Sequence, residues 1–164
     1  MKNPEPSISF RDLLSYTDYL ASRWLNYFRQ NPAALDVDVG GRTSTLRDLA
    51  SHIFQVEEFF ANFLAQEDAV GMGRPAQMEA PSLEELERMH QDASGKLEQY
   101  IASATEEKLE KMRTLGPVSA SNRKVLAQAV LHSVHHWAQV AMEVRQAGLP
   151  TERPQDIIAS PIMT

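Results

Sequence analysis

The sequence of 164 residues contains no cysteine. That absence excludes disulfide bonds, cysteine-ligated zinc, iron–sulfur clusters and a protein thiol acting as nucleophile. No uninterrupted apolar run approaches the roughly 18 residues that a membrane-spanning helix needs. The first ten residues have neither the basic nor the apolar region of a secretory signal. We therefore expect a cytoplasmic protein with no membrane partner.

Basic residues are in the minority, with 16 Lys and Arg against 22 Asp and Glu and a net charge of −6. Because the basic residues are also scattered along the chain, the sequence lacks the electrostatic footprint of a nucleic-acid-binding protein. Apolar residues make up 43% and charged residues 23%, as in an ordinary globular protein. This length and composition predict a single domain over residues 1–164.

Apolar side chains recur every three or four residues in four segments, the spacing that places them on one face of a helix. These stripes run from Phe10 to Phe28, from Leu46 to Leu64, from Leu83 to Ile101 and from Leu126 to Val144. No alternating strand pattern and no internal repeat are visible. The sequence therefore predicts an all-α protein, a four-helix bundle.

Helix boundaries are predicted from capping residues and from glycine and proline. We expect the first helix to start at Ser7 or Ser9 and to end at Asn31-Pro32. The second opens near Thr43–Thr45 and fades at Gly71, and Ser82 with Glu85 forms the capping box of the third. A short helix is expected around Glu106–Met112, ended by Gly116-Pro117, and the fourth long helix runs from Ser119 or Ser121 to Gly148.

Two connecting segments bear on how the helices assemble. Gly71–Pro81 contains two glycines and two prolines. A connection of about fifteen residues spans about 50 Å when extended, more than the about 33 Å of a 22-residue helix, so it can cross the bundle lengthwise. The tail, residues 151–164, carries Ile157, Ile158, Ile162 and Met163, which suggest docking on a surface or on a partner chain.

Three of the five histidines lie in the fourth predicted long helix. His132 and His136 are four residues apart, one helical turn, the spacing by which a helix offers two imidazoles to one metal ion. His52 lies at the edge of the apolar stripe of the second helix. In a bundle, metal sites are built from inward side chains on facing helices, so these three can form a three-nitrogen site. The alternative is that all three are hydrogen-bonded core or groove histidines.

The segments 49–58 (LASHIFQVEE), 130–140 (VLHSVHHWAQV) and 144–148 (VRQAG) resemble the DinB/YfiT-like family, and the similarity covers nearly the whole chain. The resemblance implies that His52, His132 and His136 are the metal ligands. It also implies a four-helix bundle in up-down-down-up order, with the long connection between helices two and three, and a homodimer. One departure is Trp137-Ala138, where many members have Arg-Gly.

The resemblance further implies a metal-dependent transferase that joins a low-molecular-weight thiol, such as bacillithiol, mycothiol or glutathione, to a small electrophilic substrate. Two other functions stay open. One is a hydrolase that uses metal-bound hydroxide, and the other is a non-catalytic binding or stress-response module stabilised by its metal. Imidazole ligands suit zinc, nickel or iron.

Five further residues are candidates near this site. Asp48, Gln128 and Gln139 lie three or four residues from a predicted ligand and are candidates to hydrogen-bond its second ring nitrogen. His90 falls on the stripe of the third helix, where it is either a hydrogen-bonded core histidine or a fourth ligand. His135 points away from the His132–His136 pair and is expected to be peripheral.

Overall fold

The computed structural model describes residues 8–41, 43–66, 80–150 and 156–163. Its elements, in chain order, are α1 (Phe10–Gln30), the 3-10 helix η1 (Pro32–Asp36), α2 (Leu46–Ala65), α3 (Leu83–Ser103), α4 (Glu106–Glu110), β1 (Met112–Leu115), β2 (Val118–Ser121), α5 (Asn122–Gln146) and the 3-10 helix η2 (Ile157–Ala159). The prediction of a mostly helical protein is confirmed.

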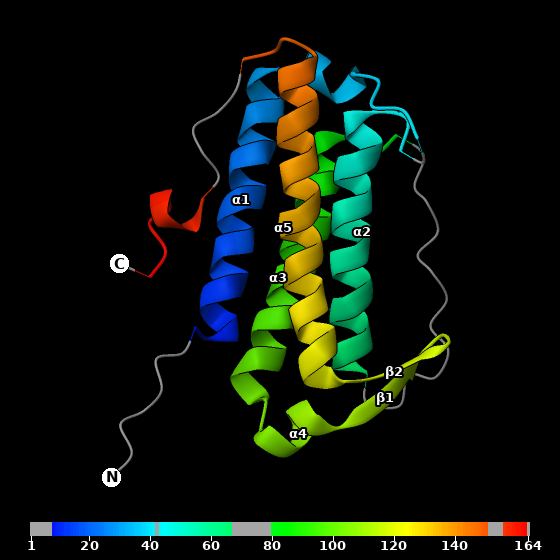
Figure 1. Cartoon of the computed structure of the whole chain (residues 1–164), viewed down its shortest axis with the longest axis vertical. Helices are drawn as coiled ribbons and strands as arrows, with labels where there is room; N and C mark the ends of the chain where they lie inside the picture. Colours follow the sequence, from blue (N-terminus) through cyan, green and yellow to red (C-terminus); the bar gives the residue numbers. More distant parts are fainter. Residues whose placement is uncertain (1–7, 42, 67–79, 151–155, 164) are drawn as a thin grey trace.

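Four long helices form the body of the structure (Figure 1). Helices α3 and α5 each pack against both α1 and α2, so α1 and α2 lie on one diagonal and α3 and α5 on the other. In Figure 1, α1 and α5 run in one direction and α2 and α3 in the other. Most of the predicted connection Gly71–Pro81, and the predicted end of the second helix at Gly71, lie outside the described residues.

Each long helix begins at a residue whose side chain accepts a backbone hydrogen bond. Reciprocal capping boxes start α1 with Ser9 and Asp12, α2 with Thr45 and Asp48, and α3 with Ser82 and Glu85. Ser121 caps α5. Helix α5 ends at Gln146, and Gly148 follows the C-cap residue Ala147. There φ is 68° and the Leu149 N–H donates to the Val144 carbonyl at 3.1 Å, the arrangement that favours glycine at this position.

The buried apolar side chains fall into two clusters stacked along the bundle. The first contains Trp24 of α1, Phe54 of α2, Leu86 of α3 and Trp137 of α5, and the rings of Trp24 and Trp137 stack at 6.2 Å. The second contains Leu14, Phe60, Leu97 and Leu126 from the same four helices. Each helix therefore contributes to both halves of the core.

On each long helix a polar residue lies between positions that belong to the two clusters, and on α3 a second polar residue, Ser94, follows shortly after. These polar residues are Asp18 of α1, Glu57 of α2, His90 and Ser94 of α3, and Ser133 of α5. We call these five residues the polar layer. Glu57, His90 and Ser133 are buried, and Asp18 and Ser94 are partly buried.

A β-hairpin lies directly before α5, where the sequence predicts the end of a short helix. Strand β1 pairs with β2 in antiparallel register, Met112 opposite Ser121 and Leu115 opposite Val118. The sequence did not predict this hairpin, and the short helix predicted around Glu106–Met112 ends at Glu110. The physical reason is Gly116, whose φ of 59° suits the first central position of a two-residue hairpin turn.

Arg113 ties this hairpin to the end of α2. Its guanidinium donates to the carbonyls of Phe63 and Gln66, both at 2.6 Å, and lies 3.9 Å from the centre of the Phe63 ring. Phe63 lies in the last turn of α2 and Gln66 is its C-cap residue, so no later N–H of the helix reaches either carbonyl. A buried cation thus completes the C-terminus of a helix.

The tail packs partly on the chain itself, beside α1 in Figure 1. Ile157 and Ile162 pack against the first apolar cluster, whereas Ile158 is 93% exposed and Met163 is exposed. The predicted docking on a surface is confirmed for Ile157 and Ile162. Residues 151–155 and 164 lie outside the described residues.

We expect Arg113→Met to lower the free energy of unfolding by about 2–4 kcal/mol, because it leaves two carbonyls at the end of α2 without their charged donor. Urea denaturation followed by circular dichroism measures the change. Arg88→Met is the matched control, because Arg88 is exposed in the second turn of α3. Its effect should stay within about 0.5 kcal/mol. Equal losses in the two variants would contradict a specific role for Arg113.

Candidate metal centre

Three imidazoles converge where α2 packs against α5. His52 comes from the second turn of α2, and His132 and His136 lie one turn apart on α5. One nitrogen from each ring can be chosen so that all three lie within 4.8 Å of one another. The ring centres are 5.1 Å apart for His52–His132, 5.0 Å for His52–His136 and 4.3 Å for His132–His136.

This convergence is the arrangement predicted from the sequence. All three side chains are half-buried, so each ring is held by its helix while one side of the group stays near solvent. Among the described residues no other group of histidines and carboxylates has this geometry. Three histidines placed in this way can hold one metal ion.

Burial and mutual repulsion keep two of these rings neutral. Burial, with the charges of His136, His52 and His135, lowers the pKa of His132 to about 3. Burial also lowers the pKa of His136, although the hydrogen bond to Gln139 opposes the shift. A neutral imidazole presents a lone pair, which is the form that binds a metal.

The second nitrogen of His136 has a defined partner. Its Nδ1 lies 2.5 Å from Oε1 of Gln139, so Nδ1–H donates to the amide and the lone pair of the ring is left on Nε2. The Nδ1 atom of His132 is buried and has no hydrogen-bond partner among the described residues. A buried ring nitrogen without a donor or acceptor is costly, and coordination of an ion at this group removes such a cost. These residues fit a metal ion.

The structure places the other candidates as follows. Gln139 contacts a predicted ligand, as proposed for it from the sequence. The Asp48 carboxylate accepts from the backbone and hydroxyl of Thr45 in the cap of α2, and Gln128 is exposed. His135 is exposed, as expected, with its ring centre 5.2 Å from that of His136.

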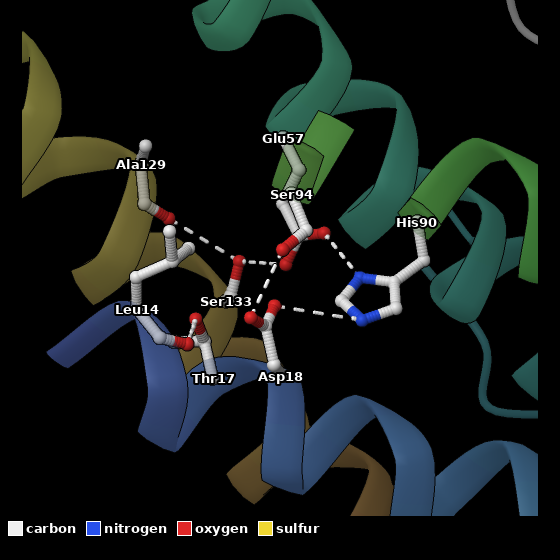
Figure 2. A network of polar contacts seen from close by, with 8 residues as sticks. All are labelled: Leu14, Thr17, Asp18, Glu57, His90, Ser94, Ala129 and Ser133. Carbon is white, nitrogen blue, oxygen red and sulfur yellow. Dashed lines mark hydrogen bonds and ion pairs between the residues drawn. The ribbon is translucent and has the colours of Figure 1, made fainter. Parts of the chain in front are cut away.

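His90 lies apart from the three converging histidines, within the polar layer. Its Nδ1 is 3.2 Å from Oε2 of Glu57, and its Nε2 is 3.6 Å from Oδ1 of Asp18 (Figure 2). The interpretation of His90 as a hydrogen-bonded core histidine is confirmed.

Sequence reasoning missed both carboxylates of this layer. Glu57 lies four residues after buried Ile53 and three before buried Phe60, and Asp18 lies four after buried Leu14. A charged residue on the apolar stripe of a helix was the signal that could have found them.

None of the helices in the described residues is long and apolar enough to cross a membrane.

Comparison with known proteins identifies a family from the sequence and a similar fold from the structure. The sequence model of the DinB family matches residues 10–156. The structure is similar to the crystal structure of a DinB-like protein from Bacillus subtilis, with a TM-score of 0.60 and 21% identity over 88% of this chain and 92% of the other. At that identity the likeness concerns the fold. A comparison with curated proteins gives no match.

Replacing any one of the three converging histidines with alanine should abolish stoichiometric zinc binding, because two imidazoles alone bind the ion far more weakly. Metal content after equilibrium dialysis, measured by mass spectrometry, tests this for His52→Ala, His132→Ala and His136→Ala. His135→Ala is the control and should keep its zinc. Undiminished zinc in the three single variants would contradict the site.

Gln139→Leu should weaken zinc binding by about 10–100-fold, because the hydrogen bond that orients His136 is lost. Competition with a chromogenic chelator measures the affinity. Gln128→Leu makes the same chemical change at an exposed position of α5 and should leave the affinity unaltered. If the two leucine variants bind zinc equally well, Gln139 does not orient the ligand.

Proposed function

The chain belongs to the DinB family, and from its three converging histidines we propose that it is a metal-dependent enzyme. In this proposal His52, His132 and His136 bind one divalent transition-metal ion, each through one ring nitrogen. Imidazole ligands suit zinc, nickel, iron and copper, and of these we propose zinc, nickel or iron. The single observation that carries the proposal is the approach of the three ligand atoms to within 4.8 Å.

We propose the up-down-down-up order for this bundle. The directions of the four long helices in Figure 1 support it. This order needs a long connection from the end of α2 to the start of α3, and the sixteen residues between Gln66 and Leu83 supply the length.

Three protein ligands leave room for a further ligand, as in catalytic rather than structural metal sites. His90, the candidate fourth ligand from this chain, has both ring nitrogens facing carboxylates of the polar layer. Among the described residues no fourth histidine or carboxylate joins the group. The proposal therefore favours a substrate-binding position over a closed structural site.

We propose that the substrate at this position is a low-molecular-weight thiol. A metal ion supplies the chemistry of lowering the pKa of a coordinated thiol, so that the nucleophilic thiolate is present at neutral pH. The chain has no cysteine, so such a thiol must come from a second molecule. The residues of the chain act by holding the site together: Gln139 fixes the tautomer of His136, and burial keeps His132 neutral. The reaction we propose is attack of the thiolate sulfur on a small electrophile. A C–S bond forms while chloride leaves a chlorinated aromatic or a C–O bond of an epoxide opens. The proton lost by the thiol passes to solvent or, in the second case, to the alkoxide.

The experiment incubates zinc-, nickel- or iron-loaded protein with glutathione, bacillithiol or mycothiol and a chlorinated aromatic or an epoxide. Conjugate formation, followed by mass spectrometry, should need both the metal and the thiol. His136→Ala should reduce the rate to that of the metal-free protein, whereas Gln128→Leu should leave it unchanged.

The same samples are assayed on an activated ester without thiol. Turnover there, lost in His136→Ala, would replace the transferase with a hydrolase that activates water at this site. If the metal binds and neither reaction exceeds the metal-free control, the site is a stabilising one, and chelation should then only lower the melting temperature.

A further inference from the structure

The polar layer connects all four long helices through side chains alone (Figure 2). The hydroxyl of Ser133 on α5 donates to Oε1 of Glu57 on α2 at 2.6 Å. The other oxygen of Glu57 faces Nδ1 of His90 on α3 at 3.2 Å. On the far side of the ring, Nε2 faces Oδ1 of Asp18 on α1 at 3.6 Å, and Ser94 donates to the second oxygen of Asp18 at 2.9 Å.

The imidazole of His90 therefore lies between two carboxylates, one opposite each nitrogen. A neutral imidazole has a single N–H, so its other nitrogen would direct a lone pair at a carboxylate oxygen. An imidazolium has two N–H groups and suits both neighbours. The hydroxyls of Ser133 and Ser94 supply donors to the remaining oxygens of Glu57 and Asp18, so it is the ring proton that completes the arrangement.

We propose that His90 is an imidazolium in the folded protein at neutral pH and that its extra proton is a latch that holds α1 and α2 against α3. While the ring is charged, the latch holds α1 and α2 against α3. Loss of the proton leaves a buried carboxylate opposite a nitrogen lone pair, which is unfavourable in a low-dielectric interior.

The charges around the ring favour this state. The acidic groups that face it are Asp18 from α1 and Glu57 from α2, while α5 contributes the neutral hydroxyl of Ser133. Burial alone would lower the pKa of His90, but the hydrogen bond to Glu57 and the charges of Glu57 and Asp18 outweigh it and raise the pKa above its usual value. Burial raises the pKa of Asp18 as well, although the charge of His90 and the hydrogen bond from Ser94 lower it. The charges of Glu57 and Glu98 make smaller contributions that raise it.

Protons can reach the latch from one side of the bundle. A surface pocket of about 490 Å³ lies between α1 and α3, and both Asp18 and His90 line it. On its rim Arg29 pairs with Glu87, so that this cation is already neutralised by a carboxylate. The latch can therefore exchange its proton with solvent without opening of the core.

The direction of the pH effect follows from the raised pKa of His90. The stabilisation is complete below the pKa of histidine in the unfolded chain, about 6.5, and is lost as the pH rises through the higher pKa of the folded state. Loosening of the α1 and α2 contacts with α3 at alkaline pH is the consequence.

The direct test is nitrogen-15 NMR of the side chain of His90 in the protein as purified. We expect both ring nitrogens to be protonated at pH 7 and the titration midpoint to lie above that of the same histidine in urea-unfolded protein. Asp18→Asn and Glu57→Gln should each shift the midpoint downward. Ser94→Ala, which removes a neighbour of Asp18 and keeps both carboxylates, should leave His90 protonated at pH 7.

Stability measurements give a second readout. Wild type should lose resistance to urea as the pH rises through the midpoint measured by NMR, and His90→Gln should lack that loss. A single protonated ring nitrogen at pH 7, or a midpoint at or below that of the unfolded chain, would overturn the proposal. The NMR titration of wild type decides this even if His90→Gln does not fold.

Discussion

The structure depends on a layer of polar and charged side chains placed inside its helical core. Burying carboxylates and an imidazole is costly unless each is paired and hydrogen-bonded. Here the cost is offset because Glu57, His90 and Ser133 satisfy one another across α2, α3 and α5, while Asp18 adds the contact from α1. An apolar interior can tolerate sliding of one helix along another, whereas these contacts are lost by a shift of one turn. The layer thus favours one longitudinal alignment of the four helices.

That alignment matters for the candidate metal centre, because α2 and α5 contribute residues both to the polar layer and to the three converging histidines. The bond from Ser133 to Glu57 joins α5 to α2, and the three converging histidines come from these helices as well. Ser133 directly follows His132, so the residue that anchors α5 and the residue that faces the metal position are neighbours on one turn. The lengthwise alignment of α2 against α5 therefore also determines how closely His52 approaches His132 and His136.

The candidate metal ligands and His90 of the polar layer differ in the charge that their surroundings favour. Burial lowers the pKa of His132 and of His136, and the neighbours that act on these pKa values are other imidazoles and the Gln139 amide, so the neutral form that binds a metal is favoured. His90 is buried at least as deeply as these two histidines. Because it lies between two carboxylates, its pKa is nevertheless raised. In this protein the groups around a histidine, more than the depth of its burial, set the direction of its pKa shift. They distinguish the candidate metal ligands His132 and His136 from His90, the proposed imidazolium.

Local signals in the sequence determined the helices and the identity of the converging histidines. Capping boxes at Thr45 and Ser82 and the glycine at 148 act within a few residues, so their effect is readable without the fold. The spacing of His132 and His136 is likewise a property of one helix. Tertiary structure alone decided which partner each buried polar group has, because Asp18 and Glu57 meet His90 from helices far away in sequence. It also decided how the hairpin docks, because Arg113 reaches the carbonyls of Phe63 and Gln66, which lie 50 and 47 residues earlier, a contact that no local pattern encodes.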